Sequence, residues 1–91
     1  MAEDKERKEE EVGEITHYFA KIQVGVVKVT QGSLKVGDRI HIKGATTDFE
    51  QEVKSLQVEH EDVEEVKKGE EAGMKVEDRV REGDKVFKIV D

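Results

Sequence analysis

The stretch Val36-Gly37-Asp38-Arg39-Ile40-His41-Ile42-Lys43 joins a tight turn to a strand of alternating polarity. Glycine tolerates the positive φ that such a turn requires, and the aspartate beside it can hydrogen-bond the backbone of the turn. Alternation then places Ile40 and Ile42 on an inner face and His41 on the outer face. The same device returns at Glu82-Gly83-Asp84-Lys85-Val86, so the sequence predicts several short strands joined by turns.

On both sides of this stretch, short apolar segments separated by glycine predict about six strands. They cover Val12 to Phe19, Ile22 to Val29, Arg39 to Lys43, Gln51 to Val58, Glu71 to Val76 and Lys85 to Val90. The parity of the apolar residues changes inside two of these segments, as is typical of β-bulges or of strands buried on both faces. We therefore expect an all-β fold, a small closed antiparallel Greek-key-like barrel. At most a turn or two of helix is expected, near Val63 to Lys67.

The charge pattern divides the chain of 91 residues into a tail and one domain. Residues 1–11 hold six acidic and three basic side chains and no apolar residue after Ala2. Such a segment has little surface to bury, so it is predicted to be a disordered tail. Residues 12–91 are predicted to form a single β-barrel domain, because this length suffices for one small domain only.

Composition excludes several classes of protein. The chain has no cysteine, so a disulfide framework, a thiolate metal site and a cysteine nucleophile are all unavailable. Charged residues make up 43% of the sequence against an ordinary value of about 25%, and asparagine is absent, a composition typical of thermophile proteins. No apolar run approaches the roughly 20 residues that span a bilayer, and the first residues lack the apolar region of a signal peptide. We expect a soluble cytoplasmic protein that does not enter membranes.

Catalytic and cofactor motifs are missing from the sequence. The eight glycines never form a phosphate-binding loop, and His17, His41 and His60 lie too far apart in sequence to suggest paired metal ligands. Neither Ser33 nor Ser55 has the setting of an activated nucleophile. The sequence therefore predicts a protein that is not an enzyme and has no catalytic residue, metal or small-molecule cofactor.

One series of turns and strands resembles a known family. It runs through Gly25 to Val29, Gly32 to Ile40 and Val53 to Val58, and continues to Val66, Gly69 and Gly73. The order and spacing are similar to the second-domain β-barrel of translational GTPases such as elongation factor Tu and initiation factor two. In those proteins the barrel packs on the GTPase domain and helps to hold aminoacyl-tRNA. The resemblance implies RNA or a translation protein as the first partner to consider.

A narrower resemblance rests on four further segments, which are Thr16 to Phe19, Lys21-Ile22, Thr46 to Phe49 and Val80 to Val86. They are similar to the C-terminal barrel of the collagenase-like peptidase family, whose members are associated with RNA modification as well as proteolysis. Because the catalytic region that precedes this barrel is not in the chain, the resemblance implies the accessory role rather than peptidase activity. It adds an RNA-modification protein to the partners that we expect.

Two surfaces are candidates for binding. The first is one end of the barrel, where a polar turn and one of the two aromatic side chains Tyr18 and Phe19 are expected to be exposed, the other being core, and could contact tRNA or rRNA. Its predicted binding residues are His17, Tyr18, Lys21, Thr46, Thr47 and Asp48. The alternative is the acidic segment 59–71, which would dock a basic protein surface and bind no nucleic acid. Both a monomer and a weak dimer are compatible with an isolated barrel.

Overall fold

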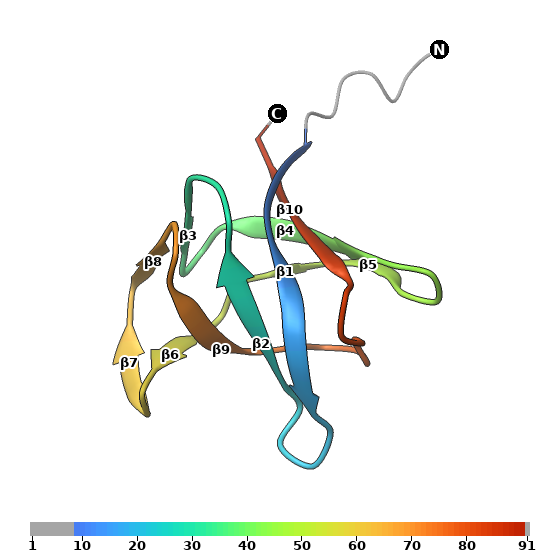
Figure 1. The fold of residues 1–91 in the computed structure, drawn as a ribbon, viewed down its shortest axis with the longest axis horizontal. Coiled ribbons are helices and arrows are strands. Elements are labelled where there is room, and N and C mark those ends of the chain that lie inside the picture. The colour runs from blue at the N-terminus through green and yellow to red at the C-terminus, as the bar shows by residue number, and fades with distance from the viewer. Residues whose placement is uncertain (1–8, 91) are drawn as a thin grey trace.

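In a computed structural model, residues 9–90 are described, and they form ten β-strands and no helix (Figure 1). The strands are β1 (Glu9–Phe19), β2 (Val24–Val29), β3 (Ser33–Lys35), β4 (Arg39–Lys43), β5 (Asp48–Glu52), β6 (Leu56–Val58), β7 (Glu61–Val63), β8 (Glu65–Lys67), β9 (Glu71–Lys75) and β10 (Lys85–Ile89). The all-β class is confirmed, but the prediction of about six strands is wrong. None of the described residues forms a helix that could cross a membrane.

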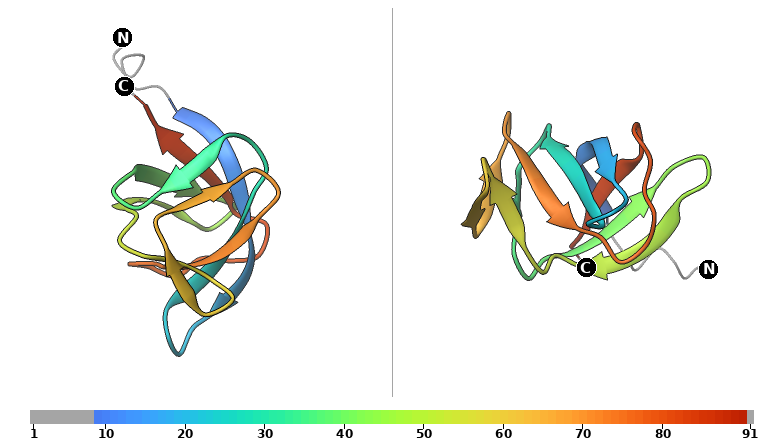
Figure 2. Two further views of the ribbon diagram at one scale, coloured as in Figure 1. Left: turned by 90° about the vertical axis from the view of Figure 1, so that its left-hand side faces the viewer. Right: turned by 90° about the horizontal axis from the view of Figure 1, so that it is seen from below.

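Eight strands form one antiparallel sheet in the order β5-β4-β10-β1-β2-β9-β6-β7. The last strand, β10, lies between β1 and β4, which brings the two ends of the described chain together at one end of the molecule (Figure 1). The predicted closed barrel is not found among residues 9–90, because no strand pairing joins β5 to β7. Seen from below, these two edges lie on opposite sides of the molecule (Figure 2).

The short strands β3 and β8 form a second, two-stranded sheet. Leu34 of β3 pairs with Val66 of β8, and both side chains are fully buried. The turn or two of helix allowed near Val63 to Lys67 does not form, because this segment is strand. The spacing of three between Val63 and Val66 fits a helix, but Glu64 instead separates two strands, and its carbonyl accepts a hydrogen bond from the amide of Val36.

Strand β1 begins three residues before the predicted start of the domain at residue 12. Glu9, Glu10 and Glu11 pair with residues of β10, so this part of the predicted 1–11 segment is ordered strand. Residues 1–8 lie outside the described residues. The pairing occurs although the side chains are acidic, because the backbone amides and carbonyls of β1 complete the ladder of β10.

The core is aliphatic. Its fifteen buried apolar residues are Val12, Ile15, Val27, Val29, Leu34, Ile40, Ile42, Val53, Leu56, Val66, Ala72, Met74, Val76, Val80 and Val86. Tyr18 and Phe49 are partly buried and pack against it. The polar side chain of Gln51 is also buried: its amide donates to the carbonyl of Lys75 at 2.9 Å and accepts from the amide of Glu77 at 2.8 Å. Both ends of this amide are thus satisfied, as burial requires.

A bulge in β1 decides which of its side chains face outward. The register with β2 shifts between Ile15 and His17, so Thr16 is an extra residue. Ile15 points into the core, and Tyr18, opposite Gly25, lies on the inner side. The shift turns His17 and Phe19 outward, where they are exposed.

Candidate functional site

The outer face of β1, β2, β9 and β6 carries apolar side chains that the core does not use. His17 is opposite Val26 and Phe19 is opposite Val24, all on this face. Phe19 is 51% exposed, and Ile22, in the turn between β1 and β2, is 58% exposed. These are the two most exposed large apolar side chains among residues 9–90. The parity change in β2 thus marks a second apolar face rather than a bulge.

A groove of about 860 Å³ runs over this face. We call it the outer groove; its lining residues are Phe19, Ile22, Val24, Val26, Lys28, Gln57, Val58, Glu59, His60, Gly69, Glu70, Glu71, Ala72 and Gly73. Gly73 lies opposite Val26 on one side and Gln57 on the other. Because glycine has no side chain, the outer groove is deeper at this position. Three of the carboxylates of the acidic segment, those of Glu59, Glu70 and Glu71, lie along it. The outer groove therefore combines an apolar centre with acidic groups.

The predicted polar turn lies elsewhere, in the hairpin between β4 and β5. Thr46, Thr47 and Asp48 line a separate hollow of about 400 Å³ with Phe49, Asp78, Arg79 and Arg81. We call this the hairpin cleft. The guanidinium of Arg81 donates to the hydroxyl of Thr46 at 3.3 Å, while Thr47 is buried. The hairpin cleft and the outer groove share no lining residue.

The structure therefore divides the predicted binding residues between different surfaces. His17 lies on the outer face, 3.5 Å from the carboxylate of Glu82, and its ring lies 6.3 Å from that of Phe19. Lys21 is exposed in the adjoining turn, whereas Tyr18 packs against the core. Phe19, rather than Tyr18, is the exposed aromatic side chain of the pair. The exposure of Phe19 could not be predicted, because it depends on the bulge at Thr16 and no residue such as glycine indicates that bulge in the sequence.

A cluster of ionisable side chains surrounds His41 on another part of the outer surface. Its Nδ1 lies 2.9 Å from the carboxylate of Glu9, and its Nε2 lies 2.5 Å from that of Asp48. Asp48, a predicted binding residue of the polar turn, thus has its carboxylate against this ring. Glu50 also faces His41, since the two residues are paired across β4 and β5. Of the groups in the described part of the chain, this is the one that could hold a metal ion.

The surroundings of His41 favour its charged form. Burial lowers the pKa of the imidazole, but hydrogen bonds to Asp48 and Glu9 and the charges of these carboxylates outweigh burial, so the pKa is raised above 6.5. The hydrogen bond from His41 lowers the pKa of the Asp48 carboxyl below 3.8, with a further contribution from Lys43. Between these two pKa values, imidazolium and carboxylate are both charged.

The raised pKa gives stability a defined pH dependence. The contribution of a histidine with a raised pKa is complete below the unfolded value of about 6.5 and is lost as pH rises through the folded value. We expect His41→Gln to lower the melting temperature more at about pH 6 than at about pH 9, measured by circular dichroism with chelator present. At low pH the contribution of Asp48 to stability is lost, because the pH then falls through the lowered pKa of its carboxyl. An equal effect of His41→Gln at both pH values would contradict this assignment.

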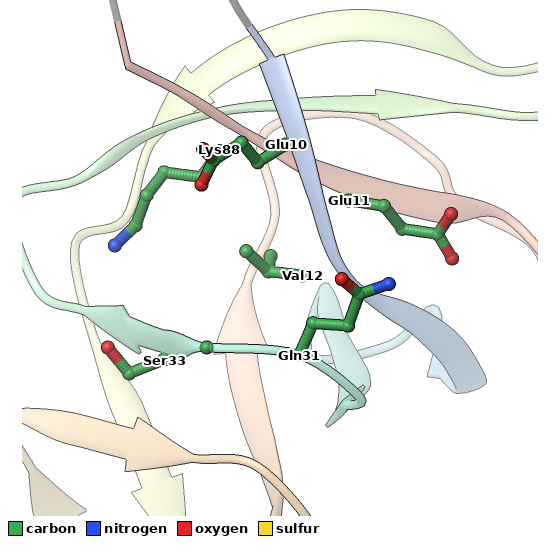
Figure 3. Close-up of a pocket in the computed structure, with 7 residues that line it drawn as sticks. Glu10, Glu11, Val12, Gln31, Ser33 and Lys88 are labelled. Atoms are coloured by element: carbon green, nitrogen blue, oxygen red, sulfur yellow. The ribbon is translucent and has the colours of Figure 1, made fainter.

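A third hollow, of about 460 Å³, lies between β1 and the loop that leads into β3. Its charged lining does not converge on one point: the side chains of Glu11 and Lys88 point in opposite directions (Figure 3). The ammonium of Lys88 instead pairs with the carboxylate of Asp38 at 3.4 Å. We therefore place no functional site in this hollow.

Known proteins with similar sequences include two peptidases. The chain is 44% identical over 78 residues to an uncharacterized protease of Methanocaldococcus jannaschii, a match that covers 85% of this chain and 19% of the relative. It is 33% identical over 79 residues to a collagenase of Porphyromonas gingivalis, covering 86% of this chain and 22% of that protein. The chain thus spans about a fifth of the length of these curated relatives.

Solved structures share the fold. The C-terminal domain of a Geobacillus thermoleovorans protein described as a U32 peptidase superposes with a TM-score of 0.80 at 16% identity, over 87% of this chain and 91% of that one. Its selenomethionine variant gives a TM-score of 0.79 at 15% identity, with coverage of 85% and 96%. The family of elongation factor Tu domain 2 matches residues 23–84. This match extends from β2 to the turn before β10, and the chain therefore belongs to the elongation factor Tu domain 2 family.

Proposed function

We propose that this domain is a non-catalytic docking module that binds a basic protein surface through the outer groove. The observation that carries the proposal is the exposure of Phe19 and Ile22 beside a groove whose centre is apolar. Large apolar side chains gathered on one face, with charges around them, are characteristic of interaction sites. Scattered exposed apolar residues would not support this reading, but these two adjoin Val24 and Val26 on one continuous face.

Charge selects the kind of partner. Glu59, Glu70 and Glu71 lie along the outer groove, whereas its lining contains one lysine, Lys28, and no arginine. A partner with an apolar centre flanked by lysine or arginine would bury Phe19 and place its cations near these carboxylates. The relatives named protease and collagenase are about five times longer than the matched segment, so an accessory role beside a larger polypeptide is consistent with them.

The test of this proposal uses two pairs of exposed apolar residues. Phe19→Ser with Ile22→Ser removes the apolar contacts of the outer groove, whereas Val36→Ser with Val90→Ser removes comparable exposed residues elsewhere. Protein captured from lysate of the source cell after nuclease treatment is identified, purified and titrated against all three forms by calorimetry. We expect the first pair to weaken binding at least about tenfold and the second to leave it unchanged.

Three results would contradict the proposal. They are equal binding by both paired variants, loss of the captured partner on nuclease treatment, and a partner whose contact surface is acidic. A further result would assign the groove to a second copy of this chain: concentration-dependent dimerisation in sedimentation experiments that Phe19→Ser abolishes. The proposal of a basic protein partner would then be replaced.

A second candidate function, RNA binding, is favoured by the hairpin cleft. Arg79 and Arg81 line it, and guanidinium groups can contact phosphate oxygens. The net charge of −7 opposes nucleic acid, so binding would be weak and sensitive to salt.

The RNA candidate predicts a specific pattern in a titration of transfer RNA at low salt. Arg79→Glu with Arg81→Glu should abolish binding, and Lys21→Glu, a charge reversal outside the hairpin cleft, should weaken it less. Tyr18→Ala is not a suitable probe because Tyr18 packs against the core. Absence of binding by the parent protein at low salt would leave protein docking as the only proposal.

A further inference from the structure

Four side chains from distant parts of the sequence meet on the outer face of β1, β4 and β5. Glu9 begins β1, His41 lies in the middle of β4, and Asp48 and Glu50 belong to β5. Strand order explains the meeting: β5 and β4 are neighbours, and only β10 separates β4 from β1. We call these four residues the His41 cluster.

Register and alternation aim these side chains at one another. His41 is paired with Glu50 on one side and with Phe87 of β10 on the other. Because Ile40 and Ile42 are fully buried, the intervening His41 must point outward. Its ring lies 6.4 Å from that of Phe87, and only 13% of its side chain is exposed. The imidazole is therefore held in place rather than free to rotate in solvent.

The spacing of the ligand atoms fits a metal ion. One atom each from Glu9, His41 and Glu50 lie within 4.8 Å of one another. Ions such as Zn²⁺ bind imidazole nitrogen and carboxylate oxygen at about 2.0–2.2 Å, so neighbouring ligand atoms lie roughly 3–4 Å apart. The separation of 2.9 Å between His41 Nδ1 and Glu9 is slightly shorter than this, so a small rotation of the Glu9 carboxylate would admit an ion.

Asp48 completes an arrangement that is common around metal-bound histidines. Its carboxylate contacts Nε2, the nitrogen on the far side of the ring from Glu9. A carboxylate that accepts the Nε2 proton fixes the tautomer in which Nδ1 carries a lone pair, and it makes that lone pair more basic. Nδ1 is the atom that faces the Glu9 carboxylate.

We propose that the His41 cluster binds one divalent first-row transition metal ion of the zinc class, with Glu9, His41 and Glu50 as ligands and Asp48 as the residue that orients His41. One imidazole with two carboxylates suits Zn²⁺ or Co²⁺, whereas Ca²⁺ and Mg²⁺ prefer oxygen ligands alone. Solvent would fill the remaining coordination positions. The ion would link the first residue of β1 to β4 and β5 across β10.

The experiment is a calorimetric titration of the chelator-stripped full chain with Zn²⁺. We expect saturable binding of one ion per chain, weakened at least about tenfold by His41→Gln or Glu50→Gln and about 10–100-fold by Asp48→Asn. His60→Gln and Glu52→Gln replace a matched histidine and a matched exposed glutamate outside the His41 cluster, and they should leave the affinity unchanged.

Cobalt provides a second readout that reports ligand identity. Co²⁺ bound to the parent protein should have a visible absorption spectrum that differs from that of the free ion because a nitrogen ligates it. This difference should be lost in His41→Gln and retained in His60→Gln. Circular dichroism checks that each variant is folded. The proposal is overturned by the absence of one-to-one Zn²⁺ binding in the parent, by unchanged affinity in His41→Gln, or by equal losses in His60→Gln, which would indicate general attraction to an acidic surface.

Discussion

Replacing Gly13 by alanine is expected to destabilise the domain by about 3 kcal/mol or to prevent folding. A Cβ atom at this position would lie 2.3 Å from the carbonyl oxygen of Lys28, which is backbone and cannot rotate away. Gly13 pairs with Val29 of β2 and with Val86 of β10, so the clash cannot be relieved without separating two central strand pairs. Urea unfolding followed by circular dichroism measures the loss.

Gly73→Ala is the matched control for this substitution. Its new Cβ would meet the Cγ1 atom of Val24 at 3.2 Å, and that methyl group lies on the outer face, where it can shift. We expect a loss of less than about 1 kcal/mol. Comparable losses for the two glycines would show that β1 and β2 do not approach as closely as the structure has them.

Leu34→Ala should cost about 2–5 kcal/mol, the usual range for removing a buried leucine. Leu34 is fully buried although β3 has only three residues, because β3 and β8 together cover one side of the core. Alanine would leave a cavity between this small sheet and the large one. Thermal and urea unfolding of the two proteins would measure the difference.

Val36→Ala controls for the loss of an apolar side chain two residues further along. Val36 is 42% exposed, so its truncation should change stability by no more than about 0.5 kcal/mol. If Leu34→Ala had an equally small effect, the two-stranded sheet could not be part of the hydrophobic core.

Local rules predicted the turns and the inward residues correctly. Gly37 and Gly83, which occupy equivalent places in the two copies of the turn, have φ values of 100° and 92°. Ile40 and Ile42, which alternation places on the inner face, are fully buried. These features depend on neighbouring residues alone, so a single sequence contains the information that they require.

Long-range pairing was the part that the sequence could not supply. The segment Gln51 to Val58 reads as one strand, but it is interrupted after Glu52, where the amide of Val53 donates to the carbonyl of Asp38. The His41 cluster was missed for the same reason: Glu9 and His41 are 32 positions apart, and the insertion of β10 brings them together. Rules based on the sequence spacing of metal ligands do not detect ligands that only strand order brings together.

The open edges of the large sheet have a consequence for solubility. An unpaired strand edge can add a strand from another molecule and so begin a growing aggregate. Both edges here are acidic: β5 has the sequence Asp-Phe-Glu-Gln-Glu and β7 has Glu-Asp-Val. Two copies that approached edge to edge would bring carboxylates against carboxylates, and this repulsion extends over a Debye length of about 8 Å at physiological ionic strength. Part of the net negative charge thus opposes edge-to-edge association of two copies, and this repulsion weakens when salt is added.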